Sequence, residues 1–447
     1  MKLHLSDEAL RCLLSSPDGA EPWVLRHLAT CARCRSRLSS LPPLHGSQIL
    51  WFRPARFESY DEAFERSQSL AMKWVHLLRR ERGEAPGLFQ ELIGRTAEQR
   101  EMLLRNSRRF RTWGLLELLI DRSLETSIQD PRRGEELGRL ALGVASLVDA
   151  DRYGADRLHD MKARAWSHIG NALRIQSDLR GADVAFQRGR KHLELGTGDL
   201  CELALFLDLE ASLRRGQRRF PDAVRLLKRA IALFSKLEDS HRVGRSLVNL
   251  SLISLYSERP EECIPLLYRA MKLIEPEKEP RLLLTAKHNL IFALTGLGQF
   301  LEAQRAYYEA LPLYRAFPDA WTQNRRAWIK GRIARGLGQL EEAELLFIAA
   351  RDGFLAEEIP YDTALVALEL ALVYAEQGRS ADLKRLAAEL VPVFTSRQIH
   401  REALVAFTCF QRAAEAERAE VKVVERVAEF LHRARYAPEL RFQEEDL

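Results

Sequence analysis

The sequence lacks the features that mark membrane and secreted proteins. No run of apolar residues approaches the ~20 that a membrane-spanning helix needs, and residues 1–8 lack the apolar core of a secretion signal. Six cysteines in 447 residues do not form a disulfide framework, so buried thiols or a metal site are expected instead. We therefore expect a cytoplasmic protein that does not enter a membrane.

Signatures of common enzymes are also missing. The chain has no Gly-x4-Gly-Lys phosphate loop, no His-Glu-x2-His metal helix and no strand–Ser–helix elbow. Its histidines are scattered, without paired carboxylates at the spacing of a catalytic site. We predict that the protein is not an enzyme and has no catalytic residues.

Strong charge of one sign is absent as well. The net charge is only +5, because 68 basic residues nearly balance 63 acidic ones. Nucleic-acid-binding proteins usually gather basic residues on one face or in one stripe, whereas here they alternate with acids. Direct binding of nucleic acid is therefore not expected.

Residues that favour strands are sparse, and residues that favour helices are abundant. Val, Ile and Thr never form the alternating runs typical of strands, whereas Leu, Ala, Arg and Glu dominate the sequence. Single cores stop growing near ~250–300 residues, so a chain of 447 residues requires several domains or an array of repeats. The sequence predicts an all-α fold.

A repeat of about 40 residues is the strongest pattern. The segment from Leu297 to Ala303 recurs from Leu337 to Ala343 almost unchanged. Each segment ends in an alanine, Ala303 or Ala343. The alanine shares its helical face with a large apolar residue four positions later and with a small residue seven positions later. Such a face lets a neighbouring helix approach closely. The anchor position recurs 40 or 41 residues apart at Ala182, Ala223, Cys263, Ala303, Ala343 and, more weakly, Leu383.

Each anchor is preceded, five residues earlier, by a predicted turn. Glycine occupies this position in three repeats, where it can take a positive φ and end the preceding helix. Each unit is therefore predicted to be a helix, a tight turn and a second helix. The turn residues are Gly298, Gly338 and Gly378 in those repeats, and Ser177, Arg218 and Glu258 in the others.

The run Gly-x4-Ala-x3-(Phe/Tyr/Leu)-x2-(Ala/Gly) resembles the tetratricopeptide repeat family over residues 161–398. The resemblance implies an extended α-α superhelix with a concave face, lined by the first helix of each pair, that binds a protein or peptide. Asn can pair there with a peptide backbone, and Arg with acidic side chains or a C-terminal carboxylate. Each candidate, taken singly, has an ordinary alternative as a solvated or inter-repeat residue. The candidates are Arg174, Arg215, Asn249, His288, Asn289, Trp328, Arg332 and Arg335.

The segments around the repeats complete the expected organisation. Residues 59–160 are expected to be helical and to hold a divergent repeat at 112–150. Residues 399–447 are expected to form C-terminal capping helices and an acidic tail. Prolines at 42, 43 and 54 predict a linker over residues 41–58. Its apolar run at 49–52 either packs along the solenoid or forms an exposed binding patch.

Residues 1–40 contain the spacing of a metal site. His27, Cys31 and Cys34 form His-x3-Cys-x2-Cys, and on a helix the first two lie one turn apart on one face. Zn²⁺ accepts nitrogen and sulfur ligands at such spacing. A fourth ligand must come from elsewhere, and His4 and Cys12 are the available groups. Ser6 is a predicted N-cap just after His4.

This segment resembles the zinc-binding anti-sigma module of bacterial regulators, through the run from His4 to Glu8 and through His27-Leu28-x2-Cys31-x2-Cys34. The resemblance implies that His4, His27, Cys31 and Cys34 bind Zn²⁺, with Cys12 as a substitute for His4. It also implies that the module sequesters a sigma factor.

Two further features of the module have more than one interpretation. Nearby arginines would lower the pKa of the thiols, or else form a solvated helix face. A segment of ~40 residues can barely bury a core, so a bound metal would at least supply folding energy; metal-free buried thiols are the alternative. The arginines are Arg26, Arg33, Arg35 and Arg37.

The sequence thus predicts a small zinc-binding helical module followed by an extended helical-repeat solenoid. The predicted role is a non-enzymatic regulator with anti-sigma-like control of transcription. The alternative is a scaffold that binds a peptide or protein and in which the zinc module is only structural.

Overall fold

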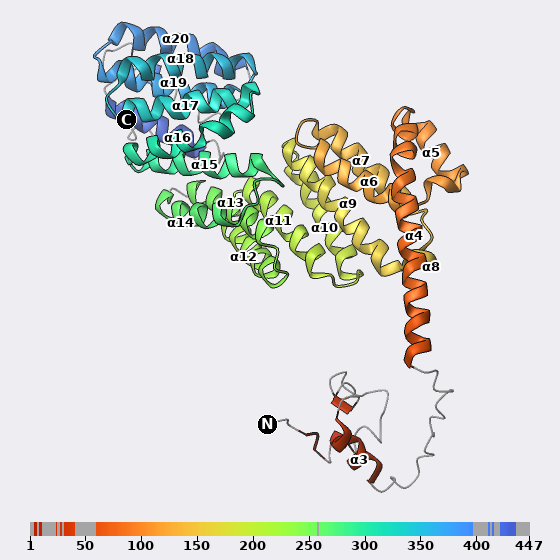
Figure 1. The fold of residues 1–447 in the computed structure, drawn as a ribbon. Coiled ribbons are helices and arrows are strands. Elements are labelled where there is room, and N and C mark those ends of the chain that lie inside the picture. The colour runs from red at the N-terminus through yellow and green to blue at the C-terminus, as the bar shows by residue number, and fades with distance from the viewer. Residues whose placement is uncertain are drawn as a thin grey trace. The chain divides into compact units, whose positions relative to one another are not determined.

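The computed structural model contains helices and no strand in the part of the chain that it describes (Figure 1). Two compact units, Met1–His76 and Leu77–Leu447, divide within helix α4 (Tyr60–Ile93). The predicted linker at 41–58 lies outside the described residues, and the module boundary at residue 40 stays a prediction. The described residues are 4–6, 9–10, 24, 27–28, 31–40, 60–256, 259–396, 410–411, 414 and 421–434.

The first unit contains a small apolar core beside helix α3 (Ala32–Ser40). The Ser6 hydroxyl accepts a hydrogen bond from the Ala9 N–H at 3.2 Å, and the Ser6 carbonyl accepts one from the Leu10 N–H at 3.1 Å. This geometry confirms the predicted N-cap. The buried residues of this core are Leu5, Leu10, Val24, Leu28 and Cys34.

The second unit begins with helices that precede the regular repeats. Among them, α6 and α7 pack on each other and lie within residues 112–150, where a divergent repeat is predicted. Gly138 allows α7 to approach α9 (Ala155–Ile175) closely, because a Cβ at this position would lie only 2.6 Å from the Cγ1 atom of Ile169 in α9. The helices are α5 (Ala97–Asn106), the short 3₁₀ helix η2 (Arg108–Phe110), α6 (Trp113–Thr126), α7 (Pro131–Ala145) and α8 (Ala150–Tyr153).

Six helix pairs then follow within the described residues, each packed as a hairpin (Figure 1). The first helices are α9 (Ala155–Ile175), α11 (Leu200–Gly216), α13 (Ser240–Tyr256), α15 (Pro280–Gly296), α17 (Ala320–Gly336) and α19 (Pro360–Glu376). The second helices are α10 (Leu179–Glu194), α12 (Phe220–Lys236), α14 (Pro260–Leu273), α16 (Phe300–Ala316), α18 (Leu340–Ala356) and α20 (Ser380–Ser396). First helices from α11 onward begin at residues 200, 240, 280, 320 and 360, which confirms the predicted period.

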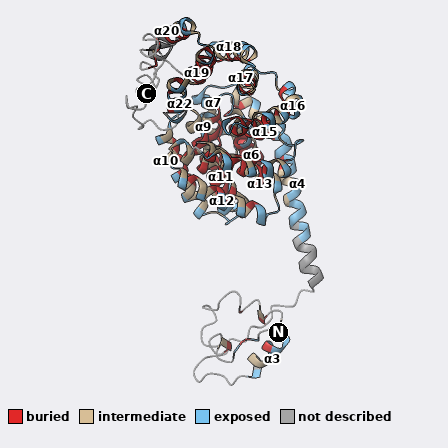
Figure 2. Cartoon of the chain, turned by 90° about the vertical axis from the view of Figure 1, so that its left-hand side faces the viewer, coloured by how far each residue is buried: buried red, intermediate tan, exposed pale blue. Residues whose placement is uncertain are grey.

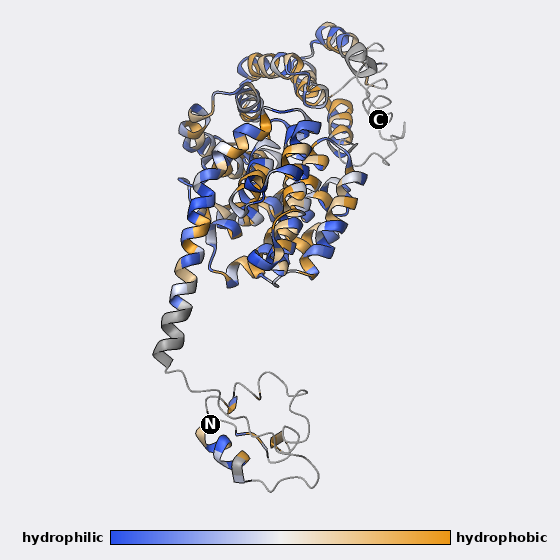
Figure 3. Cartoon of the chain, turned by 90° about the vertical axis from the view of Figure 1, so that its right-hand side faces the viewer, coloured by the Kyte–Doolittle hydropathy of each residue, from blue (hydrophilic) through white to orange (hydrophobic). Residues whose placement is uncertain are grey.

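The small–large–small pattern of the second helices is the contact surface between neighbouring helices. The α18 residues Ala343, Phe347 and Ala350 all have no exposed surface, and the corresponding Ala303, Tyr307 and Ala310 of α16 are at most 3% exposed. Buried residues line the faces between helices in Figure 2, and most helices carry both hydrophobic and hydrophilic residues in Figure 3. The pattern therefore predicted the core correctly.

The turns adopt the left-handed conformation that the glycines suggested. Gly298, Gly338 and Gly378 have φ values of 71°, 76° and 67°. Ser177 and Arg218 take the same conformation, with φ of 67° and 64°, at a cost of roughly 1–2 kcal/mol for a residue with a side chain. The sixth turn residue, Glu258, lies outside the described residues. The turn geometry is thus shared by glycine and non-glycine repeats.

The last helices close the array. Residues 364–374 of α19 are buried on all sides, because α18, α20 and the C-terminal helix α22 (Val421–Ala434) all pack against it. The Tyr361 hydroxyl donates to the Leu431 carbonyl at 2.8 Å. Helix α22 therefore covers the apolar helix at the end of the repeats. The capping helices predicted for residues 399–447 stay a prediction, and the acidic tail after residue 434 lies outside the described residues. None of the described helices is both long enough and apolar enough to cross a bilayer.

Truncation of one repeat's large residue tests this packing. Phe347→Ala should lower the free energy of unfolding by about 3–5 kcal/mol, since it removes a fully buried ring and leaves a cavity. The measurement is urea unfolding followed by circular dichroism. The control, Tyr308→Ala, removes a ring that is 58% exposed and should change stability by less than about 0.5 kcal/mol. Equal effects of the two changes would contradict the packing described above.

Candidate metal site and candidate partner pocket

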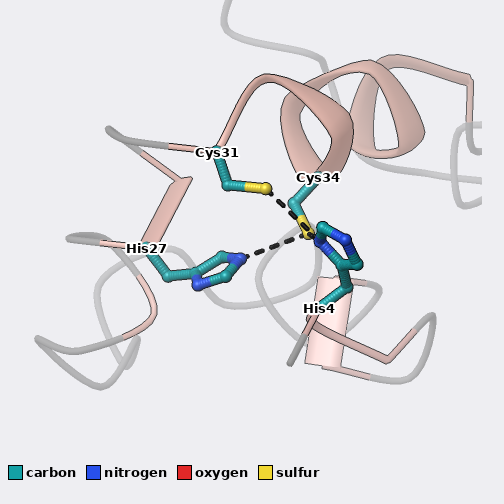
Figure 4. Close-up of side chains that lie close together, drawn as sticks. All are labelled: His4, His27, Cys31 and Cys34. Carbon is teal, nitrogen blue, oxygen red and sulfur yellow. Dashed lines mark hydrogen bonds between the residues drawn. The ribbon is translucent and has the colours of Figure 1, made fainter. Parts of the chain in front are cut away.

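Three chain segments of the first unit bring two histidines and two cysteines together (Figure 4). His4 lies in a segment outside the helices, Cys31 directly precedes α3, and Cys34 lies in its first turn. The Cys31 N–H donates to the His27 carbonyl at 2.9 Å, which places these two residues one helical turn apart, as the spacing predicted. The sequence had identified all four residues.

The separations between the four side chains match those of a tetrahedral zinc site. His27 Nε2 lies 3.3 Å from Cys34 Sγ, and His4 Nδ1 lies 3.4 Å from Cys31 Sγ and 3.5 Å from Cys34 Sγ. A tetrahedron with bonds of ~2.0–2.3 Å has ligand–ligand edges of roughly 3.3–3.8 Å. All four ligand atoms lie within 4.8 Å of one another. The residues present therefore suit Zn²⁺, although its binding stays a prediction.

Backbone N–H groups surround the two sulfur atoms. The Leu5 N–H donates to Cys34 Sγ at 3.4 Å. The pKa of the Cys31 thiol is lowered, chiefly by the Cys34 N–H, and only in smaller part by the charge of Arg35. The arginine effect predicted from the sequence is thus minor beside that of the backbone. Cys12, the alternative ligand, lies outside the described residues.

The second unit contains a cavity of about 600 Å³ lined mainly by first helices of the repeats and by α22. Aromatic side chains, including Phe292, Phe300, Trp321 and Trp328, form much of its lining. The Trp328 ring contacts the Phe292 ring edge-on, with centroids 6.3 Å apart, and the Phe354 ring at 6.0 Å. Such a cavity accepts large apolar side chains.

One face of α17 supplies a strip of alternating aromatic and basic residues. Positions four, three, four and three apart fall on one side of a helix. This spacing was visible in the sequence, but only three of the five residues were singled out from it; Trp321 and Arg325 were missed. The strip is Trp321, Arg325, Trp328, Arg332 and Arg335, and all five line the cavity.

Arg332 and Arg335, which were predicted to bind acidic groups of a partner, already form ion pairs with acidic residues of this protein. Arg332 Nε lies 3.2 Å from Glu369 Oε1, and Arg335 Nη1 lies 3.0 Å from Glu369 Oε2. Arg335 also pairs with Glu376 at 3.3 Å. Burial lowers the pKa of Arg332, and Glu369 opposes that change. The charges of these two arginines are therefore largely neutralised by Glu369 and Glu376.

Two acidic residues of α22 have no such partner. Glu425 and Glu429 line the cavity and are exposed, and neither makes an ion pair within the described part of the chain. Burial raises the pKa of the neighbouring Glu376; the charge of Arg335 opposes this change, and Glu425 and Glu369 add to it in smaller part. Helix α22 thus brings two carboxylates without an ion-pair partner among the described residues to the cavity, which Arg433 of the same helix also lines. Sequence reasoning missed these carboxylates, because nothing local indicates that α22 packs on α19 and so lines the same cavity as α17.

Two more predicted residues lie beside the aromatic lining. Asn289 is 3% exposed, and its Nδ2 has no hydrogen-bond partner within the described residues. His288 Nδ1 lies 2.7 Å from the Tyr314 hydroxyl. Burial lowers the pKa of His288 well below its usual value, with smaller contributions from the charges of Arg325 and Arg332. His288 is therefore neutral at pH 7 and helps to hold α15 against α16.

The remaining predicted groove residues do not line this cavity. Arg174 donates to Asn171 Oδ1 at 2.9 Å, and Asn249 Nδ2 lies 3.4 Å from both Asp208 oxygens. Arg215 is half-buried, and its Nη1 has no hydrogen-bond partner among the described residues. The structure thus gathers four of the eight candidates at this cavity, and His288 borders a smaller space that shares Phe292 and Trp328 with it. Partner binding by any of them stays a prediction.

The buried histidines predict how stability depends on pH. In the unfolded chain a histidine takes up a proton near pH 6.5, whereas burial lowers the pKa of folded His168 to about 4 and also lowers that of His288. The contribution of these histidines to the free energy of unfolding should therefore be at its full value above pH 6.5. Below that pH the free energy of unfolding should fall by up to about 1.4 kcal/mol per pH unit for each such histidine.

Urea unfolding at pH 7.5 and pH 5.0 measures this dependence. His288→Gln should lose less stability between the two pH values than the wild type does. His76→Gln, which changes an exposed histidine, should behave like the wild type. An unchanged loss in His288→Gln would show that His288 is not held neutral in the folded protein.

Comparisons with known proteins agree on the fold. A Rap protein complexed with competence and sporulation factor is similar with a TM-score of 0.55 at 12% identity, over 72% of this chain and 88% of that one. Aspartyl phosphate phosphatase F from Bacillus subtilis has a TM-score of 0.50 at 15% identity, over 89% and 96%. No protein-family profile matches the sequence, and no curated protein matches it significantly. At these identities the likeness establishes a helical-repeat solenoid of the kind seen in Rap proteins.

Proposed function

We propose that the protein is a non-enzymatic regulator that binds a peptide, or an extended segment of a protein, in the cavity beside α17. The observation that carries this proposal is the cavity itself, which combines aromatic lining with charged walls. Helical-repeat solenoids commonly use their concave surfaces in this way. The Rap neighbour, which was solved in a complex with competence and sporulation factor, supports the proposal by analogy of fold.

The charges around the cavity favour a particular partner. Arg332 and Arg335 are paired with Glu369, so an acidic partner would have to displace an existing ion pair. Glu425 and Glu429 are unpaired within the described residues and attract a positive group at little cost. The partner should therefore carry a lysine, an arginine or a free amino terminus next to a large apolar side chain.

Charge reversal of the α22 wall tests this partner chemistry. An array of short peptides should show preferential binding of those with Lys or Arg beside Phe, Trp or Leu. Glu425→Lys/Glu429→Lys should weaken that binding about tenfold, the equivalent of ~1.4 kcal/mol. The measurement is fluorescence anisotropy with the best peptides from the array.

A matched double variant controls for the change in net charge. Glu302→Lys/Glu341→Lys alters two exposed residues of α16 and α18 that do not line the cavity, and it should leave the affinity unchanged. The proposal fails if no peptide of this class binds, or if both double variants weaken binding equally.

For the first unit, we propose that His4, His27, Cys31 and Cys34 hold one Zn²⁺. The support is the donor set of two imidazoles and two thiols at tetrahedral separations. The module's core contains few buried residues, so metal binding would contribute to its folding. When bound, zinc would act as a structural link between the three segments.

The resemblance to anti-sigma modules extends this proposal to control of transcription. In that role the zinc-bound module binds a sigma factor, and the solenoid receives a second signal through its own partner. The competing proposal is a scaffold in which the module is only structural. Neither requires the protein to carry out chemistry.

Zinc content and sigma-factor binding distinguish the two roles. Protein purified without chelators should contain about one zinc per chain, and Cys31→Ser/Cys34→Ser should contain none. Cys201→Ser, which alters a thiol outside the cluster, should retain the metal. The absence of zinc from the wild type would refute the metal site. If zinc is present but no sigma factor from the same organism binds in a pull-down assay, the scaffold role remains.

A further inference from the structure

The metal cluster joins segments that are far apart in the sequence. His4 and Cys34 are separated by 30 positions, yet their side-chain atoms lie 3.5 Å apart. The apolar core beside them contains few residues, and a small core contributes little energy for ordering several segments. Other interactions must therefore bring the histidines to the cysteines.

Two arginines of α3 form such interactions. Arg37 Nη1 donates to the Leu5 carbonyl at 2.9 Å, and Arg35 Nη1 donates to the Leu28 carbonyl at 2.7 Å. Leu5 directly follows His4, and Leu28 directly follows His27. Each guanidinium thus contacts the backbone immediately next to one histidine.

A second hydrogen bond, made by the Leu5 N–H, also ties this residue to α3. The Leu5 N–H donates to Cys34 Sγ at 3.4 Å, while the Leu5 carbonyl accepts from Arg37. The peptide groups on both sides of this residue are therefore bonded to α3. Because His4 is the preceding residue, these bonds restrict where its imidazole can lie.

We propose that Arg35 and Arg37 are positioning residues of the metal site. Each holds one histidine-bearing segment against α3, which contains Cys34 and directly follows Cys31, so that the four ligands are assembled before the metal arrives. A preassembled site loses less conformational entropy on binding and therefore has a higher affinity. This inference rests on the proposed zinc site and differs from an effect of arginine charge on the thiols.

Arg33 provides a matched control for charge. It lies on the same helix, between the two cysteines in the sequence, is exposed, and its side chain makes no hydrogen bond or ion pair within the described residues. Arg33→Gln and Arg37→Gln therefore remove the same charge close to the same thiols. Only Arg37→Gln removes a bond to a histidine-bearing segment. Arg37→Lys keeps the charge but replaces the planar guanidinium with a flexible ammonium group.

The experiment measures zinc affinity of the full-length protein by competition with a chromophoric chelator. Arg37→Gln and Arg35→Gln should each weaken binding by roughly 10–100-fold, the usual cost of losing an outer-shell contact. The zinc affinity of Arg33→Gln should stay within about twofold of that of the wild type. The affinity of Arg37→Lys should lie between those of Arg33→Gln and Arg37→Gln. In the Co²⁺-substituted protein, Arg37→Gln should also weaken the d–d absorption bands of tetrahedral cobalt, because His4 is less well held.

The outcomes separate this inference from the zinc proposal. A wild type that binds no zinc refutes the site and the positioning role together. If the wild type binds zinc and all three glutamine variants weaken it equally, charge is the cause and the positioning role is wrong. It is also wrong if Arg35→Gln and Arg37→Gln bind zinc as the wild type does. Circular dichroism of each variant confirms that the repeats remain folded.

Discussion

Close packing of the second helix of each pair against its neighbours underlies the rest of the second unit. At the anchor positions Ala303 and Ala343 no surface is exposed, so a larger side chain would push the helices apart. The large residue one turn later fills the space between them, and its loss would leave a cavity. Because this contact repeats every 40 residues, each helix pair is held mainly by the pairs on either side.

The packing determines where a binding surface can form. Second helices use their small–large–small face for the core, whereas first helices present a second face to the cavity. On α17 that face alternates aromatic and basic residues, which a helix buried all round would not tolerate. Helix α19 differs, since residues 364–374 are all buried. The one charged residue among them, Glu369, lines the cavity and pairs with Arg332 and Arg335. The cavity thus lies where the repeat array meets its C-terminal cap.

The first unit depends on a different balance. Its apolar core is small, and the polar contacts of Leu5 and Leu28 with Arg37 and Arg35 order segments that the core alone would leave free. A metal held by the four side chains would add to this order. The module and the repeats therefore illustrate two ways to hold a helical protein together, one by repeated apolar contact and one by a few directed bonds.

The sequence by itself determined the features that depend on local spacing. The period, the buried anchors, the turn at Gly298 and the set of His27, Cys31 and Cys34 follow from residues that lie near one another or repeat regularly. His4 entered only through the resemblance to a known module, with Cys12 as the alternative. The positive φ of Ser177 and Arg218 was predictable only because they occupy the position of a glycine in other repeats. Local patterns suffice here because a helix places residues three, four and seven apart on one face.

Only the tertiary structure decided the charges around the cavity and the contacts of the arginines. Arg332 looked available to a partner, yet it pairs with Glu369 of the next repeat. Glu429 belongs to the cavity because α22 packs on α19, and Arg37 reaches the carbonyl of Leu5 across 32 positions. These contacts join residues far apart in the chain, and neither helical periodicity nor residue type indicates which distant group a long side chain will meet.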